Sequence, residues 1–197
     1  LLTYSRRVPD ATARIEGGFI RCAVPGRPPF ELDVGGIPLR GVHNEENIAA
    51  AALAASVMGA DPGVLQRTVR EYRSLPHRVE WVRSWRGIDF YDDSKGTNVG
   101  AVMRALENFD RPVWLFLGGR DKQGSYEPLV EPLQTRARGV FAFGEAAPRI
   151  CEQLGRFVPT RSFPDLEAAF REVVSRAESG DVVLLSPACS SFDQYES

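Results

Sequence analysis

The run Val113-Trp114-Leu115-Phe116-Leu117, followed by Gly118-Gly119, decides the fold class of this 197-residue chain. Consecutive apolar residues that end at a glycine pair are typical of a strand that is covered on both faces. A second run of this kind, Val182 to Leu185, ends at Ser186-Pro187. Around these runs, segments with helical periodicity alternate with short strands. This alternation predicts right-handed βαβ units in a mostly parallel sheet, and therefore an α/β fold.

The elements expected after Leu75 begin with a β-hairpin that turns at Arg86-Gly87. In order, they are strands Val79–Trp85 and Ile88–Tyr91, helix Val99–Phe109, strand Val113–Leu117, helix Glu127–Arg138, strand Val140–Phe143, helix Ala146–Leu154, strand Val158–Ser162, helix Asp165–Ala177 and strand Val182–Leu185.

The first 74 residues have a different organisation. Glycine pairs predict two hairpins, one over Ala13 to Val24 and one over Phe30 to Leu39. An alanine-rich helix is expected from Asn44 to Met58, and Asp61-Pro62 is typical of the start of another helix. Leu75-Pro76 should stop that helix, so we place a domain boundary between residues 74 and 75.

Composition excludes several classes of function. The chain has 24 basic and 26 acidic residues, a net charge of −2, which argues against nucleic acid as a partner. No apolar run approaches the about 20 residues that a membrane span requires, so we expect no membrane insertion. No secretory signal opens the chain, and its three cysteines show no CxxC spacing, as expected in a reducing cytoplasm.

Lysine is rare in this sequence. Of the 24 basic residues only Lys95 and Lys122 are lysine, and the rest are arginine. Each lysine stands in a loop that follows a predicted strand, and ligands of open α/β sheets bind beyond the carboxyl ends of strands. A retained lysine in such a place suggests a need for a compact, flexible ammonium group.

The first of these loops is DDSKGTN, from Asp92 to Asn98. Asp93 could accept hydrogen bonds from ribose hydroxyls or hold a cation, and Lys95 could neutralise a phosphate or a carboxylate. Thr97 and Asn98 stand at the expected helix start, where free N–H groups favour anions. The alternative is a polar loop that only caps the helix.

The second loop is GGRDKQG, from Gly118 to Gly124, in which Lys122 offers a point charge beside a backbone that a ligand can approach closely. The third is SPACSSFDQ, from Ser186 to Gln194, where small residues leave room for a bound group. Cys189 could act as a nucleophile, but a small buried cysteine is the commoner case.

Two further groups of polar residues leave their roles open. Asn44 and Asn47 share one face of the expected helix, where their amides could read a purine edge or cap the helix. Arg78 follows the domain boundary and could contact a nucleotide or form a structural ion pair.

In this order and spacing, five segments resemble the Mur ligase family, and within it the ligases that add D-glutamate. These are GVHNEENIAAAAL, LPHRVE, DDSKGTNVGA, FLGGRDKQG and LLSPACSSFDQ. Other muramyl ligases and the folylpolyglutamate synthetases typically carry a DYAH- or DGAH-like segment where this chain has DDSKGTN. The lysine-bearing loop is therefore the most specific part of the resemblance.

The resemblance implies an ATP-dependent amide ligase of cytoplasmic peptidoglycan precursor synthesis, and so a role in cell wall biogenesis, cell shape and cell division. It would activate the carboxylate of UDP-N-acetylmuramoyl-L-alanine as an acyl phosphate, which D-glutamate attacks, with ATP and Mg²⁺ required. The enzyme is expected to be a monomer when full length. Residues 1–74 would be the last part of the central ATPase domain, β-rich and helical. Residues 75–197 would be a truncated C-terminal Rossmann-like domain.

Site residues follow from the same resemblance. Asn44 and Asn47 would lie on the nucleotide side, and Arg78 and Asp93 match positions that contact the ATP ribose and phosphates. Lys95 matches a lysine at the reacting centre, where Asp93 and Arg78 would also act in catalysis.

The remaining assignments concern the amino-acid acceptor. Thr97, Lys122 and Ser191 match groups that hold the carboxylates of D-glutamate, and Phe192 would line the same pocket. No residue of this sequence matches a metal ligand of the family.

The sequence departs from the family in having no GxxxxGK[ST] loop. We therefore expect the chain to be a C-terminal fragment, inactive alone, with the P-loop and the magnesium ligands upstream. Two alternatives remain, a non-catalytic module that binds anions or nucleotides and another muramyl or polyglutamate ligase.

Overall fold

A computed structural model of the chain describes residues 1–37, 39, 42–73 and 75–190. The chain divides into two compact units, Leu1–Ser74 and Leu75–Ser197. Among the described residues, none of the helices combines the length and the apolar character needed to cross a bilayer.

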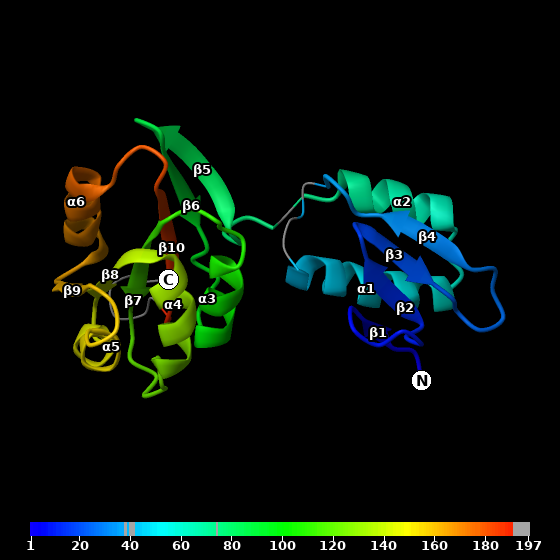
Figure 1. Ribbon diagram of the computed structural model, residues 1–197, viewed down its shortest axis with the longest axis horizontal. Coiled ribbons are helices and arrows are strands. Elements are labelled where there is room, and N and C mark those ends of the chain that lie inside the picture. Colours follow the sequence, from blue (N-terminus) through cyan, green and yellow to red (C-terminus); the bar gives the residue numbers. More distant parts are fainter. Residues whose placement is uncertain (38, 40–41, 74, 191–197) are drawn as a thin grey trace. The chain divides into compact units, whose positions relative to one another are not determined.

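The first unit contains a sheet in the order β1-β2-β3-β4, which packs against two helices (Figure 1). The elements are β1 (Tyr4–Ser5), β2 (Ala13–Glu16), β3 (Phe19–Cys22), β4 (Phe30–Asp33), α1 (Val42–Val57) and α2 (Pro62–Glu71). The hairpin predicted over Ala13 to Val24 is confirmed as β2 and β3, which are antiparallel.

The second hairpin predicted in this unit is wrong for the part that the structure describes. Only Phe30–Asp33 is a strand, and it pairs with β3. The reason is tertiary, because the Gln66 side chain of α2 bonds both the N–H and the carbonyl of Asp33, at 2.8 and 3.0 Å. Asp33 Oδ1 also accepts from Gly35 N at 2.9 Å, which turns the chain away from the sheet.

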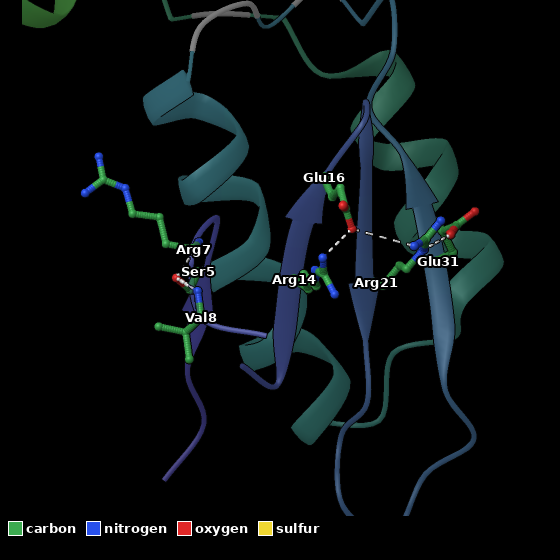
Figure 2. Close-up of polar contacts among 7 residues, drawn as sticks. All are labelled: Ser5, Arg7, Val8, Arg14, Glu16, Arg21 and Glu31. Atoms are coloured by element: carbon green, nitrogen blue, oxygen red, sulfur yellow. Dashed lines mark hydrogen bonds and ion pairs between the residues drawn. The ribbon is translucent and has the colours of Figure 1, made fainter. Parts of the chain in front are cut away.

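The two faces of this sheet differ as the alternating sequence requires. Ile15, Ile20 and Leu32 are buried in one cluster with the apolar residues of α1. The other face is exposed and carries ion pairs between neighbouring side chains (Figure 2), including Arg14 to Glu16 at 2.9 Å and Arg21 to Glu31 at 2.6 Å. Exposed pairs of this kind stabilise a fold little, so the buried side holds the unit together.

Helix α2 begins as the sequence predicted. Asp61 is its N-cap, with Oδ1 accepting from Gly63 N at 2.9 Å and from Val64 N at 3.2 Å, and Pro62 follows in the first turn. The helix ends at Glu71, before Leu75-Pro76.

The second unit is a six-stranded sheet in the order β5-β6-β10-β7-β8-β9, in which every neighbouring pair is parallel except β5 and β6. Its elements are β5 (Glu80–Trp85), β6 (Ile88–Asp92), α3 (Val99–Leu106), β7 (Val113–Gly118), the 3-10 helix η1 (Glu127–Leu129), α4 (Val130–Arg136), β8 (Ala137–Phe143), α5 (Ala147–Leu154), β9 (Thr160–Phe163), α6 (Leu166–Arg176) and β10 (Val182–Ala188). The predicted α/β fold, with a mostly parallel sheet and a β-hairpin, is confirmed.

The apolar runs are buried on both faces of this sheet. Val113, Leu115 and Leu117 belong to a cluster with α3, α4 and α5, whereas Phe116 faces a second cluster with α6. Figure 1 shows α6 on the opposite side of the sheet from α3 and α4. This two-sided burial explains why β7 reads as a continuous apolar run.

Element ends differ from the predictions by a few residues. The helix expected over Glu127–Arg138 starts with the 3-10 turn η1, and Ala137-Arg138 already belong to β8. Helix α3 stops at Leu106, and just beyond it the Asn108 side chain donates to the carbonyls of Arg104 and Ala105, which takes the place of continued helical bonding.

Asp181 ties together the edge of the sheet at which β7, β8 and β10 begin. Its side chain is only 2% exposed and accepts from Trp114 Nε1 at 2.9 Å, from Glu178 N at 3.0 Å and from Arg138 Nε at 3.1 Å. One buried carboxylate thus satisfies donors on three segments.

We expect Asp181→Ala to lower the free energy of unfolding by about 1–3 kcal/mol, since it removes the buried acceptor that three partly exposed donors share. Urea denaturation measures the change. Glu178→Ala is the matched control, because Glu178 pairs with the same arginine at 3.5 Å but is 73% exposed, and its cost should stay below about 0.5 kcal/mol. Equal losses in the two variants would contradict this account.

Candidate functional site

The loops that follow β6, β7 and β10 meet at the carboxyl edge of the sheet, because these strands are parallel neighbours. Ala188 N donates to Gly96 O at 2.8 Å, which joins the β10 loop to the β6 loop. Arg120 N donates to Ser190 O at 2.8 Å, which joins the β10 loop to the β7 loop. The structure therefore brings together the three loops that the sequence singled out.

The two lysine-bearing loops also contact each other directly. Lys122 Nζ donates to Thr97 O at 2.7 Å, across 25 positions of sequence. Both lysine side chains are exposed and Thr97 is half-buried. Lys122 and Thr97 thus lie at one place, where an anionic ligand would meet a fixed cation.

Asp93 is the buried centre of the β6 loop. It is 6% exposed, and its Oδ2 accepts from Ser186 Oγ of β10 at 2.6 Å. Its Oδ1 accepts from Val79 N at 3.3 Å. Burial raises the pKa of Asp93 above its usual value, although these hydrogen bonds and the charge of Arg78 lower it in part.

The space around this carboxylate admits only glycine at position 96. A Cβ on Gly96 would lie 2.6 Å from Ser186 Oγ and would also overlap the Asp93 carboxylate. Gly96 thus lets the loop close over the Asp93–Ser186 pair, and Gly96 N donates back to Asp93 O at 2.7 Å.

The backbone around Asp93 is strained at three non-glycine residues. His77, Val79 and Ala188 have φ angles of 65°, 49° and 59°. Each of the three is hydrogen-bonded to the β6 loop. His77 O accepts from Lys95 N at 3.2 Å. Val79 N donates to Asp93, and Ala188 N donates to Gly96. Strain of this kind persists where the surroundings over-determine a conformation, and it clusters at functional sites.

An exposed group of ionisable side chains lies on the outer side of this loop. His77, Glu80 and Asp92 each place one ligand atom within 4.8 Å of the others, a geometry in which a cation can be held. His77 Nδ1 lies 2.6 Å from Asp92 Oδ2. Partial burial raises the pKa of Asp92, but hydrogen bonds from His77 and Ser94 outweigh it and leave the pKa below the usual value.

The start of α3 follows the loop as predicted. Asn98 is the N-cap, and its Oδ1 accepts from Ala101 N at 2.9 Å. The helix start therefore lies beside Thr97 and Lys122, where its N–H groups add to the positive potential.

Cys189 does not have the surroundings of a nucleophile. It is 1% exposed, and its Sγ lies 3.1 Å from the hydroxyl of Tyr126, which is also buried. Sequence reasoning named neither Tyr126 nor Ser186 as a site residue. The signal for Ser186 was a polar residue directly after an apolar strand, whereas no local signal marked Tyr126.

The other predicted residues are placed as follows. Asn44 and Asn47 lie in the first and second turns of α1, in the first unit, with Asn44 half-buried and Asn47 exposed. Arg78 is exposed and near enough to Asp93 to lower the pKa of that carboxyl. Ser191 and Phe192 lie outside the described residues.

Relatives of known name match most of this chain. It is 45% identical over 166 residues to UDP-N-acetylmuramoylalanine–D-glutamate ligase of Solibacter usitatus, a match that covers 84% of this chain and 38% of the relative. It is 47% identical over 159 residues to the enzyme of the same name from Syntrophus aciditrophicus, which covers 81% and 35%. The chain thus spans little more than a third of the length of these relatives.

Solved structures share the fold at low sequence identity. A pseudomurein peptide ligase type C from Methanothermus fervidus matches with a TM-score of 0.70 and 15% identity, over 90% of this chain and 39% of that one. The UDP-N-acetylmuramate-alanine ligase of Thermotoga maritima matches with a TM-score of 0.67 and 16% identity, over 95% and 44%.

The family model described as "Mur ligase, glutamate ligase domain" matches residues 77–189, which include the β6 and β7 loops and the first residues of the β10 loop. This chain therefore belongs to the Mur ligase family.

Proposed function

We propose that this chain is part of an ATP-dependent ligase that joins D-glutamate to UDP-N-acetylmuramoyl-L-alanine in cytoplasmic peptidoglycan precursor synthesis. The observation that carries the proposal is the contact between the two lysine-bearing loops, with Lys122 Nζ on Thr97 O at 2.7 Å. The names of the relatives from Solibacter and Syntrophus support the same reaction.

The acceptor amino acid is assigned to the carboxyl edge of the sheet in the second unit. Lys122 and Thr97 would bind the carboxylates of D-glutamate, and Ser191 and Phe192 complete the proposed pocket. An ammonium with three donors can keep its bond to Thr97 O and still bind a carboxylate. D-Glutamate carries two carboxylates, which suits a site with a fixed cation beside a helix start.

The donor groups of this chain suit the polyphosphate of ATP. Arg78 and Lys95 are exposed cations on two segments joined by the bond from Lys95 N to His77 O. They would hold phosphate oxygens, and ATP would supply the phosphoryl group that activates the substrate carboxylate. Mg²⁺ would accompany ATP, and we assign no ligand for it in this sequence.

The nucleotide base is assigned to the first unit, which we propose to be the last part of the central ATPase domain. Asn44 and Asn47 stand three positions apart in the first two turns of α1. Their amides offer both donors and acceptors, as a purine edge requires.

The structure favours a supporting role for Asp93. Its side chain is nearly enclosed, and both carboxylate oxygens accept bonds from the chain itself. We propose that it fixes the loop on which Lys95 stands, while contact with the ATP ribose stays a prediction. Precise placement of charged groups is what acyl transfer through an acyl phosphate demands of a protein.

The reaction itself is tested with the gene product that contains this chain. We expect phosphate release that depends on D-glutamate, UDP-N-acetylmuramoyl-L-alanine and ATP together. The 197-residue chain alone should release none, because it has no GxxxxGK[ST] loop. Turnover by the chain alone, or a preference for another amino acid, would refute the proposal. Ligand binding without any turnover in either protein would favour a non-catalytic module.

Arginine should not replace either lysine. We expect Lys95→Arg and Lys122→Arg each to lower kcat/KM by roughly tenfold or more, because a planar guanidinium displaces the bound group and cannot match the ammonium geometry. Steady-state kinetics of the ligase measures this. Arg156→Lys, at an exposed position after α5, is the control and should keep normal kinetics. Normal rates in both lysine variants would contradict the assignment.

Ser186→Ala should destabilise the second unit in a pH-dependent way. The loss at pH 7 should be about 1–3 kcal/mol, because the variant removes the side-chain donor to a buried carboxylate and leaves only Val79 N bonded to it. The hydroxyl lowers the Asp93 pKa, so the variant raises it further. A group with a raised folded pKa destabilises as pH rises through that value, so the loss should shrink toward about pH 4.

Urea denaturation across this pH range measures the effect. Ser56→Ala is the matched control, because Ser56 is buried and its hydroxyl has no hydrogen-bond partner among the described residues. Its small effect on stability should not vary with pH. A pH-independent loss in Ser186→Ala would contradict the role of this hydroxyl.

A further inference from the structure

We propose that Tyr126 and Cys189 are positioning residues for the amino-acid acceptor, a role that rests on the function proposed above. The hydroxyl of Tyr126 lies 3.1 Å from Cys189 Sγ, and the two residues are 4% and 1% exposed. The contact joins the end of the β7 loop to the β10 loop across 63 positions of sequence. A buried polar contact of this kind fixes two segments in one register.

Tyr126 is itself held firmly at its own end. Its backbone N donates to Gln153 Oε1 at 2.6 Å, and Leu129 of the adjoining 3-10 helix is fully buried. Burial and the neighbouring thiol both raise the pKa of Tyr126, so the hydroxyl keeps its proton. It is therefore a fixed partner for the β10 loop.

Cys189 stands where the three loops of the site converge. The preceding residue, Ala188, bonds Gly96 of the β6 loop, and the following residue, Ser190, accepts from Arg120 of the β7 loop at 2.8 Å. A Cβ on Gly119 would lie 3.1 Å from Cys189 Cβ and closer still to the Ser190 carbonyl oxygen. The β7 and β10 loops are thus in close contact here, and the Tyr126–Cys189 pair is a side-chain bond between them.

This placement predicts which kinetic constant the pair controls. Lys122 belongs to the β7 loop and Ser191 to the β10 loop, so two of the three proposed carboxylate-binding groups stand on the segments that the pair joins. The third, Thr97, stands on the β6 loop and accepts a hydrogen bond from Lys122. Arg78 and Lys95 lie outside the two segments that the pair joins. Loosening the pair should therefore weaken binding of the acceptor and leave the binding of ATP unchanged.

The experiment uses the gene product that contains this chain. Tyr126→Phe and Cys189→Ala should each raise the KM for D-glutamate roughly fivefold, the effect expected from losing one hydrogen bond, and should leave the KM for ATP within about twofold. The double variant should match the single variants, because all three lose the same bond. Cys189→Ser, which keeps a hydrogen-bonding side chain, should recover most of the affinity.

The controls separate positioning from a general loss of stability. Cys22→Ala removes a buried thiol from the core of the first unit and should leave both KM values unchanged. The unfolding midpoint is measured for every variant, and Cys189→Ser serves where another variant fails to fold. A parallel rise in the KM for ATP, or a double variant whose effect is the product of the single effects, would overturn the proposal.

Failure of the underlying function gives a different result. A parent enzyme that ignores D-glutamate and uses another amino acid refutes the proposed substrate. The same variants, measured with that amino acid, would still raise its KM if the pair positions the acceptor. Unchanged acceptor KM values in an active D-glutamate ligase would refute the positioning role alone.

Discussion

A carboxylate removed from water governs the architecture of this site. Asp93 is a buried residue of the same loop that carries Lys95, and burial of its charge is tolerable only while Ser186 and Val79 donate to it. Those two donors come from β10 and from the segment that leads into β5. The hydrogen bonds therefore fix the β6 loop against two other segments of the second unit. The positive φ angles of Val79 and Ala188 show that the backbone is bent to make this arrangement possible.

The parallel order of the strands places two other loops beside the β6 loop. Since β10 lies between β6 and β7, its final residues touch both neighbouring loops, through Ala188 on one side and Ser190 on the other. Groups distant in sequence, such as Thr97 and Lys122, thereby come within 2.7 Å. The opposite edge is stabilised by a second buried carboxylate, Asp181, whose partners are structural. Both edges contain a buried carboxylate that accepts hydrogen bonds from other segments. Only the carboxyl edge also has exposed lysines, Lys95 and Lys122.

Local patterns predicted the fold well, because apolar runs and glycine turns express burial directly, and they singled out three loops that the structure brings together. They were less informative where a distant side chain decides the outcome. Gln66 ends the strand at Asp33, and no pattern within Phe30 to Leu39 contains that information. Likewise, the DDSKGTN segment predicts a site residue at Asp93 but cannot show that Ser186, 93 positions away, donates a hydrogen bond to it. Tyr126 was missed for the same reason, since its partner Cys189 is 63 positions away.

The structure suggests a physical reason why lysine, and not arginine, stands at positions 95 and 122. One of the three N–H donors of Lys122 bonds a backbone carbonyl. Among the described residues, the other two have no hydrogen-bond partner. A guanidinium could reach the same carbonyl, but its planar fork would carry the positive charge farther from Thr97. Lys95 is exposed on a loop whose backbone is hydrogen-bonded to His77, Asp93 and Ala188, so an exposed side chain stands on a backbone that is held in place. A compact charge on a fixed loop is the combination that an anionic substrate requires when one of its groups must also react.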